Sequence, residues 1–158
     1  MDTVQMIIVG VIVAYAIYDL PPFFRTMKRS KMSSWSIDEL DKIVVETLSY
    51  MSNKYSVPSP QYRLDVDLGE PYGGYVHNPD MILISKKLRF DAKGVDQYFQ
   101  AVIHEFTHHM DKIDVESRGK DWDEEYANKK EFYEMRAESL AWKEGKLLFK
   151  KFRKDGIL

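Results

Sequence analysis

The sequence predicts an α+β fold preceded by one transmembrane helix. Three observations support this prediction: an apolar segment at the N-terminus, three longer stretches with apolar residues at helical spacing, and short strand-like segments between the first and second stretch. A chain of 158 residues has room for one domain and an appendage. We expect an anchor at residues 1–22, a basic juxtamembrane linker at 23–35 and a folded domain at 36–158.

The composition restricts the classes of function. Hydrophobic residues make up 44% and charged residues 30% of the chain, which fits a folded globular protein. The formal net charge of -2 gives no reason to expect a nucleic-acid partner. The absence of cysteine excludes disulfides, cysteine–zinc sites and thiol catalysis. Histidine is scarce but concentrated, since three of the four histidines fall between residues 104 and 109.

The N-terminal segment is uncharged from Thr3 to Tyr18. As a helix these residues would measure about 24 Å, slightly less than a hydrocarbon core of about 30 Å, and aromatic residues at the ends can extend the span at the interfaces. A cleaved signal peptide would begin with a positive charge, whereas this chain carries Asp2. A buried core helix is the alternative, but a segment that is apolar all round favours an anchor.

The charges after the apolar segment predict its orientation. Arg25, Lys28, Arg29 and Lys31 follow within a short distance. By the positive-inside rule, this basic flank places the C-terminal domain in the cytoplasm. We therefore expect a single-pass membrane protein with a short external N-terminus.

A helix is predicted to begin after Ser36. Ser36 and Glu39 have the spacing of a capping box, and apolar residues then recur at helical spacing up to about Tyr55, before Pro58. Alternation of apolar and polar residues over 62–68 predicts a half-buried strand. Residues 75–85 have the pattern of a strand, a turn at 78–80 and a second strand, so we expect a small antiparallel sheet.

Two further helices complete the predicted domain. Apolar residues from Val95 to Ile113 have helical spacing and follow Gly94, which predicts a second amphipathic helix. A polar connection over 118–123 leads to a long third helix from about Glu124 to Phe152.

The second helix carries the sequence His104-Glu105-Phe106-Thr107-His108. Residues four apart lie on one face of a helix, so the two imidazoles can converge on one Zn²⁺. Glu105 follows the first histidine and points to the side of the metal, where a general base can deprotonate a zinc-bound water. The alternative interpretation is a solvated polar face, but a Glu and two histidines among buried apolar residues are costly unless paired or metal-bound.

A catalytic zinc requires a third protein ligand. Glu131, Glu134 and Glu138 lie on one face of the third predicted helix, and any of them could reach the metal. His77 is a further candidate in the predicted hairpin. The other interpretation is that all three glutamates are surface charges.

The motif, with the sequence from Glu134 to Ala141 on a later helix, resembles the gluzincin branch of zinc peptidases, which includes thermolysin and the small minigluzincins. The resemblance covers roughly residues 62–148 and implies a minimal zincin-like domain. It implies that His104, His108 and Glu134 bind zinc, that Glu105 is the general base, and that Glu138 is a carboxylate that orients a ligand histidine. In the family, Asp or Asn is more common than Glu at the position of this orienting carboxylate. Glu138 is also the second choice for the third zinc ligand.

The same resemblance assigns a role to the hairpin, whose edge strand in gluzincins binds extended peptide by strand addition. An ordinary hairpin is the alternative. The downstream histidine of thermolysin, which stabilises the transition state, has no counterpart here; Tyr75, Tyr126 and Tyr133 are the candidates to replace it. His109 is expected to be a residue behind the ligands or at the surface.

From these features we expect a membrane-anchored, zinc-dependent endopeptidase that hydrolyses peptide bonds through a zinc-bound water. Two alternatives remain open: a zinc-binding but non-catalytic membrane-tethered interaction or regulatory protein, and a tethered interaction protein without metal. The expected partners are a protein or peptide substrate and the membrane.

Overall fold

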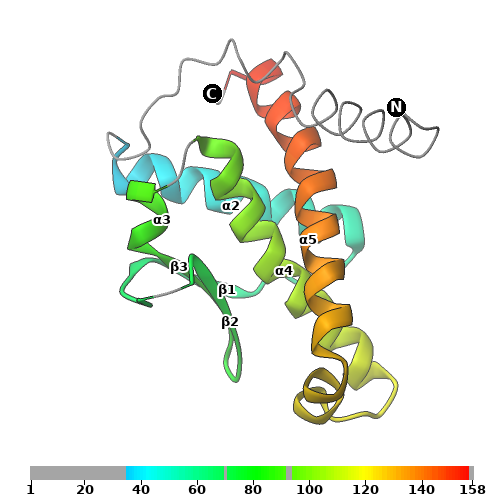
Figure 1. Cartoon of the computed structure of the whole chain (residues 1–158). Helices are drawn as coiled ribbons and strands as arrows, with labels where there is room; N and C mark the ends of the chain where they lie inside the picture. The colour runs from blue at the N-terminus through cyan, green and yellow to red at the C-terminus, as the bar shows by residue number, and fades with distance from the viewer. Residues whose placement is uncertain (1–34, 70, 92–93, 157–158) are drawn as a thin grey trace, which may run out of the picture. The chain divides into compact units, whose positions relative to one another are not determined.

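A computed structural model of the chain describes residues 35–69, 71–91 and 94–156 (Figure 1). The α+β class is confirmed, with a three-stranded sheet and a long C-terminal helix. Within the described ranges, no helix is long and apolar enough to cross a membrane. The predicted anchor at 1–22 and nearly all of the predicted linker at 23–35 lie outside the described residues.

Helix α2 (Ile37–Tyr55) begins as the sequence predicted. The Ser36 hydroxyl accepts a hydrogen bond from the Glu39 amide at 3.2 Å, and the Glu39 carboxylate accepts one from the Ser36 amide at 2.7 Å. These two bonds confirm the capping box, which satisfies amide groups that the first helical turn leaves without partners. The helix ends at Ser56, whose φ of 55° is left-handed. Its buried face is formed by Leu40, Ile43, Val44, Thr47, Leu48 and Met51.

The sheet consists of β1 (Gln61–Val66), β2 (Gly73–His77) and β3 (Asp80–Ser85), in the order β1-β3-β2. Strands β2 and β3 form the predicted antiparallel hairpin, but β1 pairs with β3 in parallel. The prediction of an antiparallel sheet is therefore wrong for one of the two pairings. The chain forms the edge strand β2 first and then returns through the hairpin into the middle, so β3 runs in the direction of β1.

One face of the sheet packs on the helices. Ile82 and Ile84 of β3 are fully buried. Tyr62 of β1 is the register partner of Ile82, and its hydroxyl donates to Asp41 of α2 at 2.7 Å. The apolar alternation thus indicated the buried face correctly. Strand β2 is left at the edge of the described sheet, because β3 is its one partner there.

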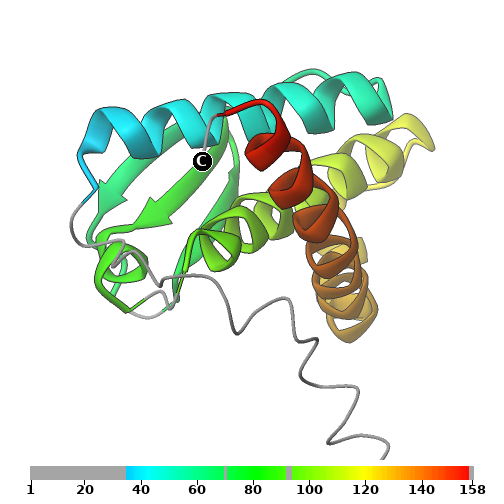
Figure 2. The same cartoon turned by 90° about the horizontal axis from the view of Figure 1, so that it is seen from above.

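Helix α4 (Val95–Ser117) is central to the domain and contacts α2, β2, β3 and α5 (Trp122–Lys154). Figure 2 shows it between the sheet and α5. Both helices match the predicted segments to within a few residues at the ends. The structure adds a short helix that was not predicted, α3 (Lys86–Asp91), and a kink in α5 at Lys129, where φ is -130° and ψ is 28°.

Candidate metal centre

His104 and His108 lie one turn apart on α4 and face each other. Their Nε2 atoms are 3.2 Å apart, and the ring centroids are 4.9 Å apart. The apolar residues around them, including Val102, Ile103 and Phe106, are fully buried and fix the rotation of the helix. The same rotation that buries these residues directs both imidazoles toward α5.

Glu134 of α5 completes a triad of donor groups. One of its oxygens, Oε2, lies 3.3 Å from His104 Nε2, and the other, Oε1, lies 3.8 Å from His108 Nε2. Each of the three residues offers one donor atom, and these atoms lie within 4.8 Å of one another. The structure therefore brings together the two motif histidines and one of the three glutamates considered as third ligand.

The dimensions of this triad suit zinc. Tetrahedral coordination with bonds of about 2.0–2.1 Å separates neighbouring donor atoms by about 3.3 Å. The Nε2–Nε2 distance of 3.2 Å and the His104–Glu134 distance of 3.3 Å are close to this value. Two imidazoles and one carboxylate also leave a fourth position open, as catalytic zinc sites do.

The protonation states favour metal binding. Burial, with a smaller effect of the neighbouring His104, lowers the pKa of His108 to about 4, so its imidazole is neutral at pH 7. Burial tends to raise the pKa of Glu134, but the hydrogen bond from Tyr126, followed by smaller electrostatic effects of His108, His104 and Lys130, outweighs burial and lowers the pKa. A neutral imidazole and an ionised carboxylate are the forms that bind a cation.

Glu105 is buried beside the triad, with 8% of its surface exposed. Burial, followed by repulsion from the Glu134 carboxylate, raises the pKa of Glu105 to about 8. A bound dication would oppose this shift through its own charge. A carboxylate with a pKa near the working pH is suited to accept and return a proton.

Gly73 explains how strand β2 can approach this carboxylate. A Cβ atom built on Gly73 would lie 2.9 Å from Glu105 Oε1, closer than real Cβ contacts allow, and 3.1 Å from its Cγ, which is also a tight contact. Glycine at this position therefore allows the edge strand to pass directly over the general-base candidate.

A groove of about 430 Å³ opens beside the triad. Its lining includes His104, Glu105 and Glu134, together with the apolar side chains of Leu88 and Trp142. Exposed Glu138 also lines the groove, but it forms no hydrogen bond or ion pair with either histidine among the described residues. Glu131 is exposed and is not part of the triad.

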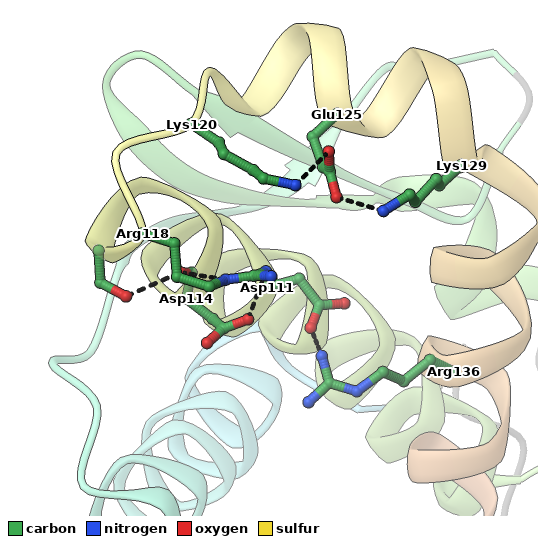
Figure 3. Close-up of polar contacts among 8 residues, drawn as sticks. Asp111, Asp114, Arg118, Lys120, Glu125, Lys129 and Arg136 are labelled. Atoms are coloured by element: carbon green, nitrogen blue, oxygen red, sulfur yellow. Dashed lines mark hydrogen bonds and ion pairs between the residues drawn. The ribbon is translucent and has the colours of Figure 1, made fainter.

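The sequence analysis did not predict two buried polar features of α4, one at His108 and one at Asp111. The His108 Nδ1 atom is buried and has no hydrogen-bond partner within the described part of the chain. Asp111, one turn later on the same helix, is 1% exposed, and its carboxylate forms an ion pair with Arg136 of α5 (Figure 3). Asp111 lies three residues after His108 in the sequence, and this helical spacing was the signal that could have drawn attention to it. The ion pair of Asp111 joins the two helices that carry the donor groups.

Tyr126 is the member of the three candidate tyrosines that lies at the triad. Its hydroxyl donates to Glu134 Oε1, and its ring packs edge-on against His108 with centroids 5.7 Å apart. Burial, with the hydrogen bond to Glu134, raises the pKa of Tyr126, so the hydroxyl remains a donor at neutral pH. Tyr133 packs with Val115 and Trp122 in an apolar cluster against which Tyr126 also lies.

The remaining histidines lie outside the triad. His109 is 2% exposed, so the expectation of a surface position is wrong, and its Nε2 donates to the Pro58 carbonyl at 2.9 Å. Tyr75 lies beside His109, at 3.3 Å from its Nδ1, and also contacts Asp80. His77 forms an ion pair with Asp123 at 3.3 Å.

The turn between α4 and α5 is held by surface ion pairs (Figure 3). Arg118 contacts Asp114 at 2.8 Å, and Glu125 contacts both Lys120 at 3.3 Å and Lys129 at 2.7 Å. Water and salt screen ion pairs of this kind. The two pairs of Glu125 connect the first segment of α5, which carries Tyr126, to the turn before it and to the kink after it.

A scan against protein-family models, a search of curated proteins and a search of solved structures each return no match.

Proposed function

We propose that the protein is a zinc-dependent endopeptidase in which His104, His108 and Glu134 hold the metal. The observation that carries the proposal is the convergence of three donor atoms from two helices within 4.8 Å, directly beside a buried glutamate. The resemblance of the motif to gluzincins adds the reaction class, peptide hydrolysis, by analogy.

The roles of the side chains follow from their positions. Bound Zn²⁺ would lower the pKa of a water ligand and polarise a carbonyl oxygen. Glu105 accepts the proton from the attacking water and donates it to the leaving amine. Tyr126 orients the Glu134 carboxylate through its hydroxyl. Gly73 allows strand β2 to lie close beside the Glu105 carboxylate.

An extended peptide is the substrate that this site would accept. Strand β2 has a free edge in the described sheet, and Gly73 at its start lines the same groove as the triad. Addition of a peptide strand at such an edge binds backbone groups without regard to sequence. The apolar N-terminal segment, proposed as a membrane anchor with the domain in the cytoplasm, would keep the enzyme at the membrane.

The test combines metal content with turnover. Zinc is measured by elemental analysis in the wild type and in His104→Ala/His108→Ala, and cleavage of a peptide library is measured for the wild type, Glu105→Gln and, as a control, Glu124→Gln on the exposed first turn of α5. We expect near-stoichiometric zinc that the double variant loses. Glu105→Gln should retain zinc and lose at least about 100-fold in turnover.

Two results would count against the proposal. Full activity of Glu105→Gln would exclude this residue as the general base. Zinc in the wild type without any cleavage would favour the alternative function, a tethered zinc-binding interaction protein.

A further inference from the structure

The outer surface of helix α5 exposes several large apolar side chains. Phe132 is 55%, Met135 67%, Trp142 53% and Leu147 44% exposed. Single exposed apolar residues are common on proteins, but a cluster on one helix marks an interaction surface. Helix α5 lies at the edge of the domain, on the side of α4 away from the sheet (Figures 1 and 2).

The same side of α5 is strongly basic. Helical spacings of three, four and seven residues place five exposed cations beside Trp142 and Leu147. We call this surface the basic–apolar face of α5; it consists of Phe132, Met135, Trp142, Lys143, Lys146, Leu147, Lys150, Arg153 and Lys154. In the half of α5 that carries these cations, Glu138 lines the groove and Glu144 is buried, and Glu131 is exposed at the other end of the face, beside Phe132.

The cations of this face have no acidic partner in the part of the chain that the structure describes. Among the described residues, Lys143, Lys146, Lys150, Arg153 and Lys154 form no ion pair, and the Lys146 ammonium lies 5.0 Å from the centre of the Trp142 ring. Several other lysines have acidic partners, as Lys54 does with Glu144. The face therefore keeps its full positive charge on a chain whose formal net charge is -2.

We propose that the basic–apolar face docks the domain onto a membrane surface that contains anionic lipids. Helices that lie in a membrane interface combine exposed apolar side chains with lysine and arginine. Tryptophan is favoured at the level of the headgroups, and the long stems of lysine and arginine allow their charges to reach phosphate groups. Attraction to anionic headgroups supplies the electrostatic part of the binding.

The apolar members of the face favour lipid over nucleic acid. Single-stranded nucleic acid binds by stacking of bases on aromatic rings, a contact that Met135 and Leu147 cannot provide. Insertion into the acyl region uses aliphatic and aromatic side chains alike. The uncharged segment from Thr3 to Tyr18 independently predicts that this chain resides at a membrane.

Docking does not require the metal centre, so this proposal and the proposed function can fail separately. The two features meet at Trp142, which belongs to the basic–apolar face and also lines the groove. A docked domain would therefore present one wall of its groove to the membrane surface.

The absence of cysteine allows a direct test on the full chain. Ser139→Cys, at an exposed position between Met135 and Trp142 of the basic–apolar face, and Ser49→Cys, on the exposed side of α2, are each labelled with an environment-sensitive fluorophore. The labelled proteins are combined with vesicles of phosphatidylcholine, with or without phosphatidylglycerol, whose acyl chains are brominated. We expect several-fold stronger quenching at Ser139→Cys than at Ser49→Cys, only with anionic vesicles, and loss of this difference at high salt.

Matched variants separate the face from the net charge. Lys143→Glu/Lys150→Glu/Lys154→Glu should abolish the quenching, whereas Lys42→Glu/Arg63→Glu/Lys120→Glu, with the same change in net charge, should retain it. Leu147→Ser should weaken the quenching, and Val45→Ser on α2 should not. Circular dichroism checks that each variant is folded, and a chelator should leave the quenching unchanged.

Three results would overturn the proposal. The first is no quenching at Ser139→Cys with anionic vesicles. The second is equal quenching at both labels or with neutral lipid. The third is binding of a single-stranded oligonucleotide by the basic–apolar face without any quenching by vesicles.

Discussion

Replacement of Glu134 by glutamine, beside the same replacement of Glu138, tests the metal centre most directly. The two glutamates are four residues apart on α5 and line the same groove. Glu134 alone approaches the imidazoles, at 3.3 Å from His104 and 3.8 Å from His108. Glutamine keeps the size of each side chain and removes the charge, so the pair isolates the ligand function from the shape of the groove.

The expected magnitude follows from the linkage between zinc binding and folding. Zinc at about 100 times its dissociation constant stabilises the native state by about 2.7 kcal/mol. Loss of one ligand should raise the dissociation constant by at least about 100-fold, because even changes to residues behind the ligands cost about 10–100-fold. At the same zinc concentration the stabilisation of Glu134→Gln is then about 0.4 kcal/mol.

Thermal unfolding followed by circular dichroism measures this difference. Each protein is heated once with zinc and once with a chelator, and the shift in Tm is compared within the same variant. A difference of about 2.3 kcal/mol corresponds to roughly 9 °C at about 4 °C per kcal/mol for a domain of this size. The wild type and Glu138→Gln should show the full shift, and Glu134→Gln should show almost none.

The reverse pattern would refute the assignment of the third ligand. If Glu138→Gln lost the zinc-dependent shift and Glu134→Gln kept it, Glu138 would be the ligand and α5 would have to rotate from its position in this structure. If the wild type itself showed no shift after reconstitution with zinc, the metal centre as a whole would be refuted.

Three further predictions concern the contacts that support the site. Glu144 is fully buried; burial tends to raise its pKa, but hydrogen bonds from Lys54 and two tyrosines outweigh this effect and lower the pKa. Glu144→Gln should therefore destabilise the domain by about 2–4 kcal/mol at pH 7, measured by urea unfolding. The difference in stability between the wild type and the variant should shrink as the pH falls below the ordinary carboxyl pKa of 4.5. Arg136→Met should lower the free energy of unfolding by about 2–3 kcal/mol in the same assay, because it leaves the charge of Asp111 buried without its partner. The 43% exposure of the Arg136 side chain makes this effect smaller than that of a fully buried pair. An unchanged urea midpoint would contradict the role of this pair. Tyr126→Phe should weaken zinc binding by about 10-fold in a chelator competition, and equal affinity would show that its hydroxyl does not orient the ligand.

The parts of the fold that depend on local interactions were predictable from the sequence. The capping box of α2 involves two residues three positions apart, and the β2–β3 hairpin involves neighbouring strands with a turn between them. The facing of His104 and His108 likewise follows from their spacing on one helix. In each case the pattern and the contact lie within a few residues of each other.

The pairing of the strands and the choice of third ligand depend on distant contacts. Apolar alternation indicated which face of β1 is buried but gave no order for the strands, and so the parallel β1–β3 pairing was missed. Helical spacing left Glu131, Glu134 and Glu138 as equal candidates. The choice depends on the rotation of α5, which is fixed by the buried small residues Ala137 and Ala141, three and seven positions after Glu134.

A groove of about 430 Å³ is small for a site that must select one peptide among many, and its edge strand would bind backbone groups that all peptides share. If both proposals hold, selectivity among peptide substrates would come from the location of the enzyme at the membrane. A domain tethered by its N-terminal segment and docked through α5 would meet membrane-bound peptide segments at a high effective concentration, whereas free peptides would bind only through the weak local contacts. The same peptide should therefore be cleaved more efficiently when a lipid chain attaches it to the vesicle than when it is free in solution. Charge reversal on the basic–apolar face should reduce that advantage without changing the cleavage of the free peptide.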